Sequence, residues 1–155
     1  MKPKLYLEST IPSYLASWPS RDLIVAGHQQ ITQEWYNNRS RHFQLFISQF
    51  VLDEIAQGDP LVAKQRLSRI KGFPLLGITE EVSIIAADLI RSGVIPKKAA
   101  TDAAHISLAA VHGMDFLLTW NCTHLANAAI IRDIERICHA NGFSCPVICT
   151  PEELL

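Results

Sequence analysis

The sequence predicts an α/β fold, in which a single domain spanning residues 1–155 forms three α/β/α layers around a mostly parallel central sheet of about five strands. Short apolar runs alternate along the chain with longer segments whose apolar residues recur at the helical period. The run from Met114 to Thr119 suits a strand that helices cover on both faces. No repeat, low-complexity tract or linker divides the 155 residues, a length close to that of one ordinary domain.

The first predicted strand is Lys4–Leu7, which is short and apolar and follows Pro3. Pro12 is expected to open a helical turn over Ile11–Ser17. Ser20 is the candidate cap of a longer helix. The apolar stripe of that helix consists of Leu23, Ile24, Ile31 and Trp35. Its solvated polar end carries Arg39, Arg41 and His42.

The second predicted strand is Gln44–Ser48, and Phe50–Gln57 is predicted as a short helix that stops at Gly58. Asp59 and Pro60 supply an N-cap and a first-turn proline for the next helix, which ends at Gly72. Three residues of this helix are spaced to face the core, namely Ala63, Leu67 and Ile70.

Residues Pro74–Ile78 are predicted as the third strand, and Thr79 as the cap of the helix that follows. Five apolar residues of that helix keep the helical period: Val82, Ile85, Ala86, Leu89 and Ile90. The loop Gly93–Lys98 leads to another helix, in which Thr101 is the predicted cap and Asp102 lies in the first turn. Gly113 is the stop signal of that helix.

The fourth predicted strand, Met114–Thr119, ends just before Asn121. Asn127 is predicted to cap a helix that stops before Gly142 and carries Ile130, Ile131, Ile134, Ile137 and Cys138. The last strand is Pro146–Cys149. The closing TPEELL contains a capping box between Thr150 and Glu153, which predicts a final helical turn.

The composition narrows the possible functions. The chain is 48% hydrophobic and 19% charged, which argues against disorder and predicts that some apolar surface lies in a subunit interface, as in a homodimer. The net charge is -1, so no polybasic nucleic-acid arm is present, and any RNA contact needs a local patch or a metal ion.

The cysteines and the N-terminal segment bear on the cellular compartment. The four cysteines form no CxxC pair and show no regular ligand spacing, so we expect reduced thiols: Cys122, Cys138, Cys145 and Cys149. Cys138 falls on an amphipathic helix and is expected to pack in the core. Neither a signal peptide nor an apolar segment of membrane-spanning length is recognisable, so a cytoplasmic location is expected, without a membrane partner.

Four oxygen-bearing side chains are expected to converge. Glu8 follows the first predicted strand, Glu54 comes after the second, Asn121 lies just past the fourth, and Asp102 begins the helix before it. The carboxyl ends of parallel strands meet at one edge of a sheet, where the ligands of open α/β sheets bind. Three neighbouring hydroxyls are secondary candidates for binding a metal-bound water or a phosphate: Ser9, Thr10 and Thr119.

Five segments, in this order, resemble the PIN-domain family: YLEST, VLDE, TDAAHISLA, LLTWN and VICTPEELL. The resemblance covers nearly the whole chain. It implies a metal-dependent endoribonuclease that acts on RNA, most often the toxin of a VapC-type toxin–antitoxin pair, with a cognate antitoxin protein as partner. The acidic site of the family maps onto Glu8, Glu54, Asp102 and Asn121. For this chain we expect apolar surface around Ile31 and Trp35 to form a homodimer or to receive an antitoxin segment.

The chemistry of crowded acids fits that activity. Carboxylates a few ångströms apart repel one another, and a divalent ion removes the conflict and holds them ionised. Hard oxygen ligands favour Mg²⁺ or Mn²⁺, and the expected reaction is hydrolysis of RNA phosphodiester bonds. On this hypothesis Glu8 and Asp102 are the principal ligands, Glu54 binds through water or serves as a base, and Asn121 supports a water or a second ion.

Two residues depart from the family pattern, because aspartate is more common at the positions of Glu8 and Asn121. A neutral amide attracts a second cation weakly, so we expect one tightly bound metal at most. A degenerate PIN domain that binds RNA or protein without cleavage is therefore the alternative. A receiver or nucleotide-binding module is a third hypothesis, although no glycine-rich phosphate loop is present.

Several other residues invite functional hypotheses. Asp115 begins the strand that Asn121 follows and is expected at the opposite end of the sheet. A zinc site built from His105, His124 and Cys122 is disfavoured because their spacing matches no zinc pattern. Lys97 and Lys98 precede Asp102 and are candidates for an RNA phosphate contact, with an exposed basic loop as the simpler interpretation.

Overall fold

The chain forms one three-layer α/β/α domain with an all-parallel sheet of five strands, which confirms the predicted fold class. The computed structural model describes residues 1–155. The strands are β1 (Lys4–Leu7), β2 (Gln44–Ser48), β3 (Leu75–Leu76), β4 (Phe116–Leu118) and β5 (Val147–Cys149). Their order across the sheet is β3-β2-β1-β4-β5. The first two strands match the predicted ranges, and the last three are shorter than the runs that predicted them.

Strand β1 lies at the centre and pairs with two strands that are distant in sequence. Leu5 is opposite Leu45 of β2 on one side and opposite Phe116 of β4 on the other. The chain proceeds from β1 toward β3 on one side and later returns to add β4 and β5 on the other. The direction of strand addition reverses between β1 and β4, and such reversal points are where open α/β sheets bind ligands.

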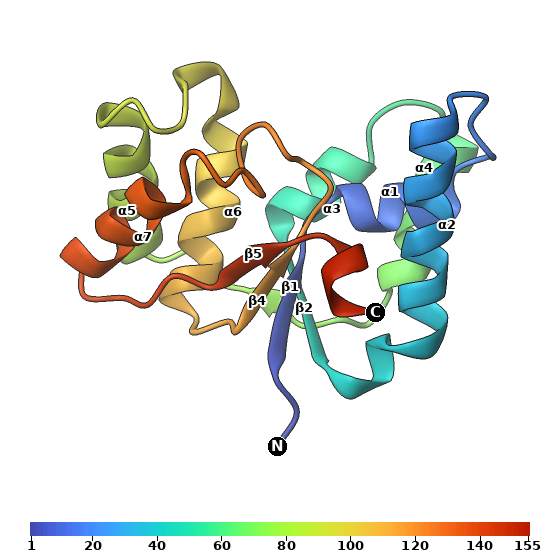
Figure 1. The fold of residues 1–155 in the computed structure, drawn as a ribbon, viewed down its shortest axis with the longest axis horizontal. Helices are drawn as coiled ribbons and strands as arrows, with labels where there is room; N and C mark the ends of the chain where they lie inside the picture. The colour runs from blue at the N-terminus through green and yellow to red at the C-terminus, as the bar shows by residue number, and fades with distance from the viewer.

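Seven α-helices and three 3₁₀ helices connect the strands. The α-helices are α1 (Thr10–Ala16), α2 (Leu23–Asn38), α3 (Gln49–Ile55), α4 (Pro60–Ile70), α5 (Glu80–Arg91), α6 (Ala100–Val111) and α7 (Ile131–Ala140). The 3₁₀ helices are η1 (Ser40–His42), η2 (Lys97–Ala99) and η3 (Pro151–Leu154). Figure 1 shows α5, α6 and α7 on one side of the sheet and α1, α2 and α4 on the other.

Some predicted helix caps are confirmed. Asp59 caps α4 by accepting hydrogen bonds from Leu61 and Val62, and Thr79 caps α5 by accepting one from Val82. The capping box of Thr150 and Glu153 is also present.

Other predicted caps are wrong. Helix α2 is capped by Asp22 rather than Ser20, whose hydroxyl instead accepts a hydrogen bond from the Asp22 backbone. Thr101 lies inside α6, which begins at Ala100 without a side-chain cap. Asn127 precedes α7 by several residues and accepts from the backbone of Ala129 in a local turn.

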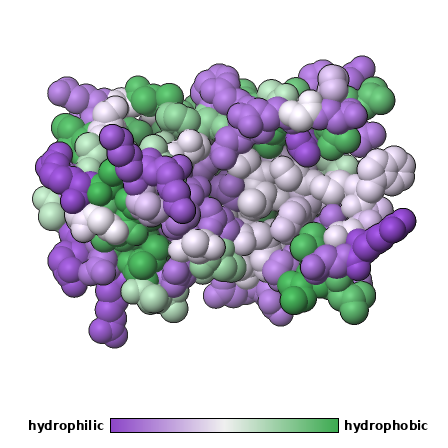
Figure 2. Space-filling model, turned by 90° about the horizontal axis from the view of Figure 1, so that it is seen from above, coloured by the Kyte–Doolittle hydropathy of each residue, from purple (hydrophilic) through white to green (hydrophobic).

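Burial corrects the predicted interface on α2. Trp35 is 0% exposed and belongs to the core, so it cannot offer a surface to a partner. Leu23 and Ile24, from the same predicted stripe, are 88% and 72% exposed because the first turn of α2 projects beyond the core. Leu67 of α4, predicted to face the core, is 38% exposed and so is only partly covered. Hydrophobic side chains on the face seen from above lie in separate groups among hydrophilic ones (Figure 2).

The cysteines are all free thiols, and Cys138 packs in the core as predicted. None of the helices is both long enough and apolar enough to cross a membrane.

Candidate metal-binding site

The candidate site lies at the carboxyl ends of the central strands. Glu8 immediately follows β1, Thr119 follows β4, and Ser48 ends β2 and caps α3, which carries Glu54. The backbone N–H of Glu8 donates to the carbonyl of Leu118, which keeps the ends of β1 and β4 together. The expected convergence of strand ends is therefore present for Glu8 and Glu54.

Glu8 is a buried carboxylate held by three hydroxyl groups. Glu8 is only 3% exposed. Oε1 accepts from Thr10 at 2.6 Å and from Thr119 at 2.6 Å, and Oε2 accepts from Ser9 at 2.7 Å. Burying a carboxylate is costly unless hydrogen bonds or opposite charge compensate it, and here neutral hydroxyls replace the hydrating water. Thus the three secondary candidates of the sequence all contact Glu8.

Ser9 joins the two glutamates. Its Oγ lies 2.7 Å from Oε2 of Glu8 and 2.9 Å from Oε1 of Glu54. A serine hydroxyl carries a single hydrogen, so it cannot donate a full hydrogen bond to two ionised carboxylates at once. One interaction stays incompletely satisfied unless a proton or a cation is added. A positive charge beside Glu8 and Glu54 would therefore be favourable.

Glu54 is also held by a row of hydrogen bonds through His105. His105 Nε2 lies 2.7 Å from Oε1 of Glu54, and Nδ1 lies 2.7 Å from the Tyr6 hydroxyl. The Tyr6 hydroxyl lies 2.7 Å from Oγ of Ser48, which accepts from the backbone of Val51. When the ring is neutral, Ser48 donates to Tyr6, Tyr6 donates to Nδ1, and Nε2 donates to Glu54. When the ring is protonated, Nδ1 instead donates to the Tyr6 oxygen, and the ring carries a positive charge beside Glu54.

Asp102 forms a separate pair beside this cluster. Its Oδ2 lies 3.1 Å from Nδ1 of His124. Both side chains are partly buried, at 17% exposed for Asp102 and 24% for His124. The charges of Glu8 and His105 both act on the pKa of Asp102, so this carboxylate lies within electrostatic reach of the cluster.

Asn121 does not point its amide oxygen at the carboxylates. The Oδ1 atom accepts from the backbone N–H groups of Thr123 and His124 at 3.1 Å and 3.0 Å. This is an Asx turn, in which the side chain caps the backbone that follows it. The turn includes the backbone of His124, the residue whose Nδ1 contacts Asp102. This geometry does not favour Asn121 as a direct metal ligand.

The two partly exposed carboxyl groups have pKa values shifted in opposite directions. Burial is the largest influence on the pKa of Glu54 and raises it, but the hydrogen bond and charge of His105, with the Ser9 hydrogen bond, bring the net pKa below 4.5. The pKa of Asp102 is raised above 3.8, chiefly by burial and further by the charge of Glu8, against the opposing effects of His105 and His124. Burial also raises the pKa of the Tyr6 phenol.

The donor atoms that gather here come from two glutamates and a histidine, and Asp102 is not among them. One ligand atom each from Glu8, Glu54 and His105 lie within 4.8 Å of one another. Both ring nitrogens of His105 are already hydrogen-bonded, so we assign it to orienting Glu54 rather than to binding metal. Oε2 of Glu54 and Oδ1 of Asp102 accept no hydrogen bond, and Oε2 of Glu8 accepts only one. Carboxylate oxygens with remaining acceptor capacity are the ligands that Mg²⁺ and Mn²⁺ prefer.

His105 is the residue that sequence reasoning undervalued. The sequence offered one signal, since His105 lies one helical turn after Asp102 and so shares its side of α6. The residues proposed for zinc do not gather, because His124 contacts Asp102, His105 contacts Glu54 and Cys122 is exposed. Asp115 lies at the opposite end of the sheet, as predicted, where Oδ2 accepts from the backbone of Lys4.

Comparison with known proteins adds no assignment: no family model matches the chain, and no curated protein matches it.

Proposed function

We propose that this protein is a divalent-metal-dependent endoribonuclease of the PIN type, which hydrolyses RNA phosphodiester bonds. The observation that carries the proposal is the buried Glu8 carboxylate joined to Glu54 through the single hydroxyl of Ser9. The single hydrogen of Ser9 cannot satisfy both carboxylates when both are ionised. A cation bound between the two glutamates would complete the interaction that Ser9 leaves unsatisfied.

In this proposal Glu8, Glu54 and Asp102 hold Mg²⁺ or Mn²⁺. A bound divalent ion polarises a phosphate and lowers the pKa of a water molecule, which is the chemistry that hydrolysis of a phosphodiester requires. The lowered pKa of Glu54 keeps it ionised at neutral pH and makes it a better ligand than a general base. His105 and Ser9 fix the direction of the Glu54 carboxylate, and Thr10 and Thr119 fix that of Glu8.

Calorimetric metal titration tests the site without knowledge of the RNA sequence. Wild type should bind Mn²⁺ at one site, and Asp102→Asn should weaken that binding because it removes one ligand charge. Asp115→Asn is the matched control, since Asp115 is an aspartate at the far end of the sheet. Equal Mn²⁺ binding by wild type and Asp102→Asn would remove Asp102 from the ligand set.

The same variants test the reaction. Wild type should cleave a labelled pool of single-stranded RNA of random sequence in Mg²⁺ or Mn²⁺, and chelator should stop the cleavage. Asp102→Asn should abolish cleavage, whereas Asp115→Asn should retain it. Cleavage by pure Asp102→Asn protein at the wild-type rate would contradict the proposal.

A second candidate function is RNA or protein binding without cleavage, and Asn121 is the observation that favours it. Its amide is neutral and its oxygen is committed to two backbone N–H groups, so a second ion lacks a ligand there. This candidate predicts RNA binding in a filter assay without metal-stimulated cleavage of any RNA in the pool.

The same proposal includes a cellular role as the toxin of a VapC-type pair. In that role the protein would form a homodimer and bind an antitoxin, which the chemistry of the site does not address. The support for a partner surface is the exposed pair Leu23 and Ile24 at the start of α2, together with the 80% exposed Trp18 in the loop before it. Exposed apolar side chains grouped in this way are typical of protein interfaces. They replace Trp35 as the proposed contact.

A further inference from the structure

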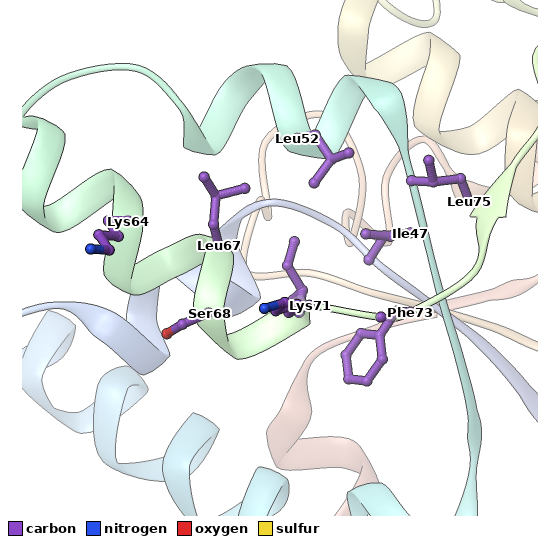
Figure 3. Close-up of a pocket in the computed structure, with 10 residues that line it drawn as sticks. Ile47, Leu52, Lys64, Leu67, Ser68, Lys71, Phe73 and Leu75 are labelled. Carbon is purple, nitrogen blue, oxygen red and sulfur yellow. The ribbon is translucent and has the colours of Figure 1, made fainter.

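A groove at the β3 edge of the sheet shares no residue with the carboxylate site. Its volume is about 490 Å³. The apolar residues that line it come from β2, α3, α4, β3 and the loop before β3, and they are Ile47, Leu52, Leu67, Ile70, Phe73 and Leu75. Figure 3 shows Leu52 of α3 and Leu67 of α4 on opposite sides of the hollow, with Ile47 and Leu75 at the strand end of it. The size and lining are those of a binding groove.

The groove adjoins an unpaired strand edge. Strand β3 is the terminal strand of the sheet, and the backbone N–H of Ile47 donates to the carbonyl of Pro74. Since Ile47 is paired with Leu75 in a parallel register, the N–H and C=O of Leu75 point away from β2. Leu75 is 51% exposed, so no helix or loop covers this edge residue completely. An extended segment can hydrogen-bond there and add a strand.

The positive charge of the groove indicates which kind of peptide segment it would bind. Lys64 and Lys71 line it, no acidic residue does, and neither lysine forms an ion pair. Figure 3 shows both lysines on the α4 side of the hollow. A segment that enters this groove therefore gains from carboxylates beside its apolar side chains.

We propose that the groove binds an extended peptide segment of a partner protein, in which the side chains that face the groove include both apolar and acidic residues. The segment pairs with the backbone of Leu75, places apolar side chains between Leu52 and Leu67, and directs its carboxylates toward Lys64 and Lys71. Because successive side chains of a strand point to opposite faces, the groove-facing residues are two positions apart in the segment. This interaction is independent of the proposed nuclease function.

Selection from a phage-displayed library of random linear peptides tests the proposal on the full chain. Wild type should enrich sequences in which Asp or Glu lies two positions from Leu, Ile or Val. The best of these peptides, synthesised with a fluorescent label, should bind Lys64→Glu/Lys71→Glu at least about tenfold more weakly by anisotropy. Lys97→Glu/Lys98→Glu, which changes the same charge elsewhere, should bind it as wild type does. Both Lys64 and Lys71 are exposed, so the variant should keep its circular dichroism spectrum.

Backbone pairing is tested on the peptide rather than on the protein. N-methylation at every second residue removes the N–H groups on one edge of the peptide only. One of the two alternating methylation patterns should weaken binding by about tenfold, and the other should not. Any of three results would overturn the proposal: no enrichment of acidic residues two positions from apolar ones, equal binding to the charge-reversed variant, or equal effects of the two methylation patterns. Self-association of wild type that Lys64→Glu/Lys71→Glu abolishes would also overturn it, since the groove would then join two copies.

Discussion

At the scale of single residues, Thr119 shows how neutral groups hold the buried charge of Glu8. Its hydroxyl donates to Oε1 of Glu8 and accepts from the backbone of Asn121, and the residue is 0% exposed. Thr119→Val keeps the shape of the side chain but leaves both partners short of a hydrogen bond. We expect the free energy of unfolding to fall by about 1–3 kcal/mol, measured by urea denaturation. Thr123→Val, at an exposed position, is the control, and an equal loss in both variants would contradict this explanation.

The opposite pKa shifts of Glu54 and Asp102 predict opposite effects on stability in metal-free protein. A lowered folded pKa means that Glu54 stabilises the fold above its ordinary pKa of 4.5, and that this contribution is lost as the pH falls through the folded pKa. A raised folded pKa means that Asp102 contributes below its ordinary pKa of 3.8 and loses that contribution as the pH rises through the folded pKa.

Urea denaturation in chelator, at neutral and at acidic pH, checks these signs. Relative to wild type, Glu54→Gln should be less stable at neutral pH, and the difference should shrink in acid. Asp102→Asn should gain stability relative to wild type as the pH rises from acid to neutral, because asparagine cannot ionise. Shifts of the same sign in the two variants would refute the assigned pKa directions.

At the scale of elements, the helix caps give a prediction in which sequence and structure disagree. Asp59→Ala should destabilise the protein by about 1 kcal/mol, because Oδ1 of Asp59 accepts from two backbone N–H groups at the start of α4. Thr101→Ala should change the free energy of unfolding by only a few tenths of a kcal/mol, since Thr101 lies within α6 and caps nothing. Urea denaturation of both variants measures the two losses of unfolding free energy. A larger loss for Thr101→Ala than for Asp59→Ala would indicate that Thr101 acts as a cap after all.

The elements also show why some boundaries escape sequence reasoning. Ser20 and Asp22 are both good capping residues and lie two positions apart, and only the path of the loop decides that Asp22 faces the first turn of α2. The stripe from Leu23 to Trp35 has the right period, but only its C-terminal part reaches the core. Local pattern states which side of a helix is apolar, whereas packing decides how much of its length is covered.

At the scale of the whole molecule, the exposed start of α2 predicts an assembly. Wild type should be a dimer by light scattering, and Leu23→Asp/Ile24→Asp should be a monomer with little change in its free energy of unfolding, because both side chains are exposed. Trp35→Ala should instead destabilise the fold by about 3–5 kcal/mol, as expected for a buried aromatic residue. A monomeric wild type, or a dimer that survives the double substitution, would exclude this surface.

The candidate site was partly predictable because a parallel sheet brings its strand ends to one edge. That rule alone places Glu8 near Glu54 although 46 positions separate them in sequence. It does not say where an amide points, and Asn121 satisfies its own turn instead of facing the carboxylates. Nor does it reveal the bond between His105 and Glu54, because that contact depends on how α6 is rotated against α3.

The hydrogen-bonded row that reaches Glu54 starts and finishes in the same helix. It leaves α3 at Val51, crosses β1 at Tyr6 and α6 at His105, and returns to α3 at Glu54. This closed series of hydrogen bonds opposes rotation of α3 about its axis, because rotation would lengthen the hydrogen bonds at both Val51 and Glu54. The direction of the Glu54 carboxylate is therefore fixed before an ion arrives, so that an ion would meet a preorganised ligand at this position.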